Sequence, residues 1–136
     1  MKFSSEKPPN YEVILKTFKV KDTSVVFTYG DTIYGVPEGY NIPQHLYRHE
    51  FVHSKQQGDN PAEWWFKYCT DSKFRLEQEL EAYSVQYHFV KVNFKRKESD
   101  QFLDIISRDL ASEIYGNIIT PIDAKFRIKR LEYKML

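Results

Sequence analysis

Large apolar residues recur in alternating steps of four and three residues between positions 76 and 94, and this pattern constrains the fold more than any other feature of the chain. On an α-helix of 3.6 residues per turn, that spacing places them along one face. Because Asp71-Ser72 supplies a start signal, we predict a long amphipathic helix that reaches about Lys95 and buries this stripe. The stripe consists of Leu76, Leu80, Tyr83, Tyr87, Val90 and Phe94.

The segment from Tyr11 to Val36 has a different pattern, rich in Val, Ile, Thr, Phe and Tyr with period-two stretches. Gly30-Asp31 is a turn signal between residues 25–29 and 32–36, which favours a β-hairpin. We therefore expect a small antiparallel sheet in this segment. Residues 1–10 are assigned to a loose N-terminal tail. Residues 11–136 are assigned to a single domain, since a chain of this length is served by one hydrophobic core.

Four further helices are predicted from start and stop signals. The first has Asn41 as a possible cap and Pro43 near its start, and Gly58 ends it after Gln57. The others start at Asn60-Pro61 and Thr120-Pro121, which are cap-and-proline pairs, and at about Phe102. Their expected spans are 41–57, 60–68, 102–115 and 120 toward Leu136. The predicted fold class is therefore α+β, with a small N-terminal antiparallel sheet packed on a helical majority.

Composition narrows the classes of partner. The net charge is +1 and 41% of the residues are hydrophobic, so we expect a globular protein that binds neither nucleic acid nor an anionic membrane. Cys69 is the single cysteine, and the chain has neither a signal-peptide h-region nor a membrane-length apolar run, which favours a cytoplasmic protein. The basic residues near expected helix ends are interpreted as solubilising: Lys91, Lys95, Arg96, Lys97, Lys125, Arg127, Lys129, Arg130 and Lys134.

The segment His49-Glu50-Phe51-Val52-His53 lies on the helix that ends before Gly58. His49 and His53 are one helical turn apart on one face, so both imidazoles can bind one tetrahedral zinc ion at about 2.0 to 2.1 Å. Glu50 lies about 100° round the helix from His49, where it can reach a water beside the metal. The spacing predicts a Zn²⁺ site with His49 and His53 as ligands and Glu50 as the general base of a hydrolase.

A catalytic zinc needs a third protein ligand, and the long helix offers Glu77, Glu79 and Glu81. Glu79 falls about 60° from the centre of the buried stripe, whereas Glu77 and Glu81 fall about 100° and 140° from it. Glu79 is therefore the predicted third ligand. Glu81 remains the alternative, because a register shift of one residue would exchange the two.

Gln56 and His45 project on nearly the same helical face as the two motif histidines. Either could contact a metal ligand or a substrate. Alternatively, Gln56 could satisfy a helix end and His45 could be partly solvated, and both interpretations stay open. The aromatic residues Trp64, Trp65 and Tyr68 are interpreted as core packing.

The run His-Glu-Phe-Val-His-Ser-Lys-Gln-Gln at 49–57, followed by Glu-Leu-Glu-Ala-Tyr at 79–83, resembles the gluzincin zinc metallopeptidases. Residues 40 to 127 are similar, more narrowly, to small metallopeptidase-like proteins encoded by phages and bacteria. The resemblance implies a minimal gluzincin-like architecture, Glu79 as third ligand, a peptide or protein substrate and a bacterial cytoplasm. It departs from the class at Tyr83, where an acidic residue often braces a zinc histidine, so the surroundings of the ligands must differ.

The expected reaction is hydrolysis of a peptide bond, with Tyr115 or Tyr83 as candidate donors to the oxyanion. If the strand Thr32–Val36 forms the sheet edge, it could bind an extended peptide by strand addition. Alternatively, the N-terminal tail covers that edge. The competing function is a zinc-containing binding or inhibitor module without proteolytic activity, which the small size of the chain suggests.

Overall fold

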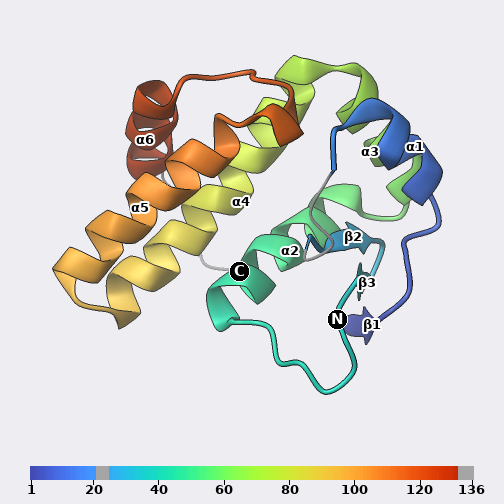
Figure 1. Cartoon of the computed structure of the whole chain (residues 1–136), viewed down its shortest axis with the longest axis horizontal. Helices are drawn as coiled ribbons and strands as arrows, with labels where there is room; N and C mark the ends of the chain where they lie inside the picture. The colour runs from blue at the N-terminus through green and yellow to red at the C-terminus, as the bar shows by residue number, and fades with distance from the viewer. Residues whose placement is uncertain (21–24, 132–136) are drawn as a thin grey trace.

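The computed structural model describes residues 1–20 and 25–131. Most of these residues are helical, and the strands lie in the N-terminal third, so the predicted α+β class is confirmed (Figure 1). The elements are β1 (Lys2–Ser4), α1 (Tyr11–Thr17), β2 (Phe27–Tyr29), β3 (Thr32–Tyr34), α2 (Gln44–Gln57), α3 (Pro61–Thr70), α4 (Ser72–Asn93), α5 (Arg96–Leu110), the 3-10 turn η1 (Glu113–Tyr115) and α6 (Pro121–Arg130).

The sheet has the strand order β1-β3-β2, so β3 is its central strand. β2 and β3 form the predicted antiparallel hairpin, whose turn needs the positive φ of Gly30, +64°. β1 pairs with β3 in parallel, with Phe3 opposite Ile33. The sheet is therefore mixed rather than antiparallel, and residues 2–4 form a strand rather than part of a loose tail. β3 has a neighbour on each side, so the condition for strand addition at Thr32–Val36 is not met. The alternative interpretation is confirmed, because residues 2–4 of the N-terminal segment cover that side of β3.

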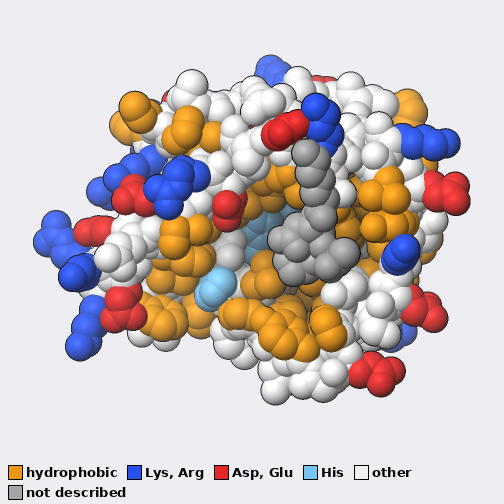
Figure 2. Space-filling view, in the orientation of Figure 1, with side chains coloured by type: hydrophobic (Ala, Val, Ile, Leu, Met, Phe, Trp, Pro, Cys, Tyr) orange, Lys and Arg blue, Asp and Glu red, His pale blue; other side chains and the backbone are white. Residues whose placement is uncertain are grey.

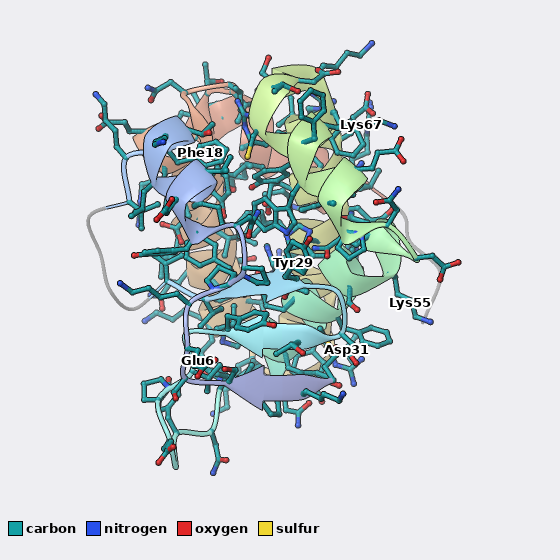
Figure 3. All side chains as sticks on the ribbon, turned by 90° about the vertical axis from the view of Figure 1, so that its right-hand side faces the viewer. Glu6, Phe18, Tyr29, Asp31, Lys55 and Lys67 are labelled. Carbon is teal, nitrogen blue, oxygen red and sulfur yellow. The ribbon has the colours of Figure 1, made fainter. Side chains whose placement is uncertain are left out.

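Residues Tyr11–Thr17 form helix α1, although their composition predicted a strand. Ile14 and Phe18, four residues apart, are buried together with Trp64, Trp65 and Tyr68 of α3. α1 and α3 lie side by side over the sheet (Figure 3). This packing outweighs the strand propensity of the β-branched residues, since propensity is a weak preference that tertiary contacts override.

The predicted helix boundaries are largely confirmed. α2 ends at Gly58, whose φ of +55° suits glycine, although its N-cap is Pro43 rather than Asn41. Asn60 caps α3, and Asp71 caps α4, as the start signals indicated. α5 begins at Arg96, earlier than expected, and ends at Leu110, so Tyr115 lies in η1 rather than in a continuous helix. The predicted extension of the last helix toward Leu136, and Lys134 with it, lie outside the described residues.

Helix α2 lies between the two halves of the molecule (Figure 1). On one side α4, α5 and α6 enclose a core, and on the other stand the sheet, α1 and α3. Val52 of α2 packs against Ala82 and Val85 of α4, which fixes the motif helix on the long helix. Within residues 1–20 and 25–131, no helix combines the length and apolar character that a membrane span requires.

Candidate metal centre

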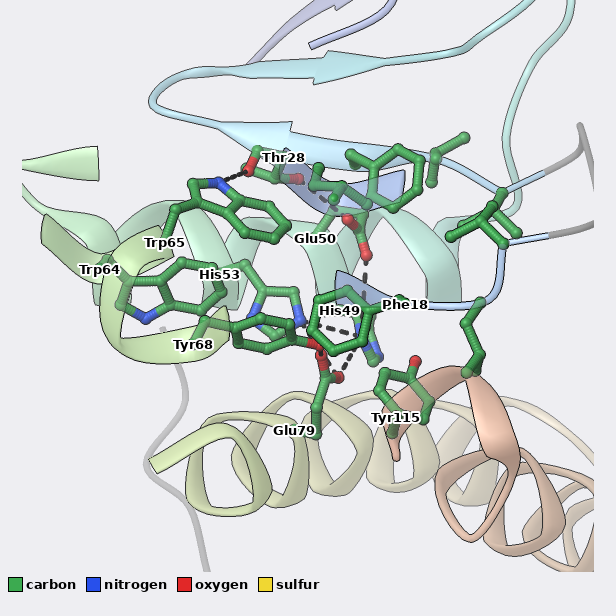
Figure 4. A pocket seen from close by; sticks show the side chains of 16 residues that line it. Phe18, Thr28, His49, Glu50, His53, Trp64, Trp65, Tyr68, Glu79 and Tyr115 are labelled. Atoms are coloured by element: carbon green, nitrogen blue, oxygen red, sulfur yellow. Dashed lines mark hydrogen bonds and ion pairs between the residues drawn. The ribbon is translucent and has the colours of Figure 1, made fainter. Parts of the chain in front are cut away.

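Three donor atoms from α2 and α4 converge on one point (Figure 4). The Nε2 atoms of His49 and His53 are 3.2 Å apart. Oε1 of Glu79 lies 3.2 Å from Nε2 of His49 and 3.3 Å from Nε2 of His53. Ligands bound to a tetrahedral zinc ion at about 2.0 to 2.1 Å stand about 3.3 to 3.4 Å from one another. The triangle of donors therefore has the size of one face of a zinc coordination tetrahedron.

Glu50 stands beside this triangle rather than in it. Ligand atoms of His49, Glu50 and His53 lie within 4.8 Å of one another, so Glu50 is also close enough to reach a metal. Its Oε2, however, is 3.7 Å from Nε2 of His49, further than Oε1 of Glu79 is. Its Oε1 accepts a hydrogen bond from the Thr28 hydroxyl at 3.0 Å. On these distances Glu79 is the better third donor, and Glu50 is held separately by the sheet.

The outer nitrogen of each histidine faces a side-chain amide oxygen. Nδ1 of His53 is 2.8 Å from Oε1 of Gln56, whose amide nitrogen donates to the Gln78 carbonyl. Nδ1 of His49 is 2.8 Å from Oε1 of Gln86. An amide oxygen only accepts, so each Nδ1 donates its proton to the amide, and whenever a ring is neutral its Nε2 lone pair points inward. The amides thus fix the tautomer in which each histidine can bind a metal.

Three acceptors that converge in a buried space require a positive charge between them. His49, His53 and Glu79 are only 4%, 6% and 3% exposed. Burial lowers the pKa of His53, but the Glu79 carboxylate outweighs it and the pKa rises to about 9. Burial likewise raises the pKa of Glu79, while the two histidines bring it well below its usual range. The positive charge is supplied either by a proton on His53 or by a metal cation.

The second oxygen of Glu79 accepts a hydrogen bond from the hydroxyl of Tyr68, at 2.5 Å. Burial, followed by the charge of Glu79, raises the pKa of Tyr68 well above its ordinary value, so the hydroxyl stays protonated and can donate. The aromatic spacing predicts core packing for Tyr68 and does not reveal this contact. The available signal was that a buried tyrosine hydroxyl usually finds a hydrogen-bond partner.

Gln86 accepts the hydrogen bond from the outer nitrogen of His49. In the gluzincin pattern an acidic residue, at the position that Tyr83 occupies here, often does so. The ring of Tyr83 packs edge-on against His49, with centroids 4.5 Å apart, and leaves Nδ1 to Gln86. Gln86 follows Glu79 by seven residues, two turns along the same face of α4, and that spacing was the signal for it. Its amide nitrogen donates to Nδ1 of His45 at 2.9 Å. Burial and the neighbouring His49 lower the pKa of His45, which favours the neutral, accepting form.

Two tyrosine hydroxyls lie on the α4 side of the site. The hydroxyls of Tyr83 and Tyr115 are 2.8 Å apart, and Tyr115 also lines the cavity described below. Burial and the Glu79 charge raise the pKa of both well above the usual value, so both remain protonated. Buried Arg75, which no sequence pattern singles out, donates to the carbonyls of Tyr115 at 3.0 Å and Tyr68 at 2.6 Å. It thereby fixes the backbone of both tyrosines.

A cavity of about 70 Å³ opens onto the three donors and Glu50. In Figure 2, histidine surface is recessed in a hollow edged by hydrophobic side chains. The volume accommodates a few water molecules beside the donors. The remaining lining residues are Ile14, Phe18, Val20, Val25, Val26, Phe27, Thr28, Trp64, Trp65, Tyr68, Ile114 and Tyr115.

The structure thus brings His49, His53, Glu79, Glu50 and Gln56 together, with Tyr83 and Tyr115 next to them and His45 one contact further out. Glu81, the alternative third ligand, is exposed and accepts a hydrogen bond from Gln56 at 3.2 Å. Comparison with models of known protein families found no match, and neither did searches of curated proteins and of solved structures. The case for a metal site therefore rests on the geometry of the chain itself.

Proposed function

We propose that the chain is a zinc-dependent hydrolase of the gluzincin type that cleaves peptide bonds, with His49, His53 and Glu79 holding the metal. The observation that carries this proposal is the triangle of donors with sides of 3.2 to 3.3 Å. A set of two imidazole nitrogens and one carboxylate oxygen suits zinc and leaves a fourth position for water or substrate. The bracing of each donor by Gln56, Gln86 or Tyr68 supports the same assignment.

Bound at these atoms, Zn²⁺ supplies a Lewis acid that polarises a carbonyl group and lowers the pKa of a water molecule toward neutrality. Glu50 is the general base. The Thr28 hydroxyl holds one of its oxygens at 3.0 Å, and the residue lines the cavity in which a water would lie. Glu50 accepts the proton of the attacking water and delivers it to the leaving nitrogen.

Tyr115 is the donor to the oxyanion that forms as the carbonyl is attacked. Each tyrosine hydroxyl has one proton, so when Tyr83 donates to Tyr115 the proton of Tyr115 is free to point into the cavity. A donor aimed at the developing charge stabilises the transition state. Tyr83 orients Tyr115 and packs against His49, which links the donor to the metal ligands.

The test is digestion of a broad peptide library by the wild-type protein, with and without a chelator, and by Glu50→Gln. We expect cleavage that the chelator abolishes, and a loss of about 10²- to 10⁴-fold in Glu50→Gln with zinc still bound. Glu77→Gln is the matched control, because Glu77 is an exposed carboxylate of α4. Undiminished cleavage by Glu50→Gln would refute the assignment of the base.

A second candidate function is zinc-dependent binding without hydrolysis. The side chains around the site are only 3–6% exposed, and the adjoining cavity has a volume of about 70 Å³. These four side chains are His49, Glu50, His53 and Glu79. A closed site with four protein ligands is structural rather than catalytic, and Glu50 would be the fourth ligand. Absorption spectra of the Co²⁺-substituted protein separate the two candidates, since an open site responds to added anions and a four-ligand site does not.

A further inference from the structure

The outer edge of β2 is closed by side chains of α2 and α3. The amide nitrogen of Gln57 donates to the carbonyl of Thr28 at 2.8 Å, and its amide oxygen accepts from the Gly30 N–H at 2.7 Å. The indole N–H of Trp65 donates to the same Thr28 carbonyl at 3.1 Å. The hydroxyl of Ser54 donates to the Gly30 carbonyl at 2.7 Å.

Gln57 acts on this edge as a neighbouring strand would. Thr28 lies opposite Ile33, between the pair that flanks the turn, Tyr29 and Thr32, and the next pair along the strands. Its carbonyl points away from β3 and accepts a hydrogen bond from Gln57. An added strand would engage this carbonyl and the N–H two residues further on. One amide side chain, 4% exposed at the end of α2, satisfies both groups. The edge that lies nearest to the metal ligands is therefore paired within the chain.

The same strand residue also holds the proposed base. Thr28 is 2% exposed, and its hydroxyl donates to Oε1 of Glu50 at 3.0 Å while Gln57 and Trp65 hold its carbonyl. Gln57 and Glu50 are seven residues apart on α2, two turns along the helix. Thr28 is therefore hydrogen-bonded to two residues of the same helix, Gln57 through its carbonyl and Glu50 through its hydroxyl.

We propose that Gln57 is a positioning residue, which sets the orientation of Glu50 by holding the Thr28 carbonyl in a hydrogen bond. By occupying the same edge, Gln57 also excludes strand addition of a peptide at Thr28–Gly30. This inference rests on the proposed role of Glu50 as general base. A shift of Thr28 along the strand would release Oε1 of Glu50, which would then be free to rotate away from the cavity or toward the metal ligands. A substrate must accordingly reach the site from the cavity side and not as a fourth strand on β2.

The experiment measures three variants of the zinc-loaded protein: Gln57→Leu, Thr28→Val, and the double variant that carries both changes. Each is compared with Ser54→Ala. Ser54→Ala is the matched control, because it removes a bond from α2 to the same hairpin without touching Thr28. Gln57→Glu is the second variant, since it keeps the acceptor for Gly30 and loses the donor to Thr28. Melting temperature and zinc affinity are measured for each, and kcat and KM are measured on a cleaved peptide.

We expect Gln57→Leu and Thr28→Val each to lower kcat about tenfold or more, with KM and zinc affinity within about threefold of wild type. The double variant should be no slower than either single one, because both act through one contact. Gln57→Glu should follow Gln57→Leu, and Ser54→Ala should resemble wild type. Equal rates in Gln57→Leu and Ser54→Ala, or multiplicative losses in the double variant, would overturn the proposal.

A second readout does not depend on turnover. Crystal structures of zinc-loaded wild type and Gln57→Leu should show the bond between Thr28 and Glu50 intact in the first and broken in the second. If wild type binds zinc but cleaves nothing, the proposed function fails while this comparison still decides the positioning role. A Thr28–Glu50 bond unchanged in Gln57→Leu contradicts that role.

Discussion

The hydrogen bond from Tyr68 to Glu79 should account for a large part of the affinity of the site for zinc. The change to test is Tyr68→Phe, which removes one oxygen atom and keeps the ring that packs against Trp64. In wild type the bond is 2.5 Å long, buried, and made to a carboxylate whose other oxygen faces the two histidines. The variant therefore leaves one oxygen of a buried charge without its donor.

The expected loss follows from the strength of such a bond. A hydrogen bond to a charged group contributes about 1.5 to 3 kcal/mol, and loss of an outer partner of a metal ligand weakens metal binding about 10- to 100-fold. The two estimates agree, because a factor of ten in Kd corresponds to about 1.4 kcal/mol. We expect the Kd of Tyr68→Phe for zinc to rise by about one to two orders of magnitude.

The assay is competition for zinc with a chromophoric chelator near neutral pH. Tyr87→Phe is the matched control, since Tyr87 is a buried tyrosine of α4 whose ring packs in the cluster with Leu80 and Leu103. Its Kd should stay within about twofold of wild type. The reasoning is refuted if Tyr68→Phe also stays within twofold, or if the two variants weaken zinc binding equally.

Three further predictions concern the surroundings of the ligands. Metal-free His53 has a pKa of about 9 and is therefore protonated below that pH, so zinc binding at pH 7 should release about one proton. For the same reason, the affinity for zinc should rise about tenfold per pH unit up to pH 9. Calorimetry in buffers of different ionisation enthalpy measures this release, and buffer-independent heats would contradict it. Gln86→Leu should weaken zinc binding about 10- to 100-fold in the chelator assay, whereas His45→Ala, one contact further out, should change it less than threefold. Arg75→Met should lower the free energy of unfolding by about 2 to 4 kcal/mol in urea titrations, because it removes the donor to the buried Tyr68 carbonyl and to the partly buried Tyr115 carbonyl. An unchanged midpoint would exclude that role.

The parts of the fold that depend on local sequence could be predicted. Cap residues and the spacing of the apolar stripe placed α3 and α4 close to their observed starts. The same helical geometry selected Glu79 over Glu81, and the structure puts Glu79 beside the histidines with Glu81 exposed. These placements agree with the structure because the position of a residue around one helix is fixed by the 3.6-residue repeat alone.

The parts that depend on pairing between distant segments could not be predicted. β1 joins β3 across about thirty residues, and α1 is a helix because Ile14 and Phe18 meet α3. Gln86 is 37 residues from His49, and Thr28 is 22 residues from Glu50. A glutamine or threonine in isolation has no pattern that names its partner, so these contacts emerge only once the elements are packed.

The most direct test of a zinc site at these residues is a crystal structure of the zinc-loaded protein, with the metal identified by its anomalous scattering. We expect zinc bound to Nε2 of His49, Nε2 of His53 and one oxygen of Glu79, with a non-protein ligand in the fourth position and Glu50 hydrogen-bonded to Thr28. Zinc held by Glu50 as a fourth protein ligand, or bound away from these three side chains, would contradict it.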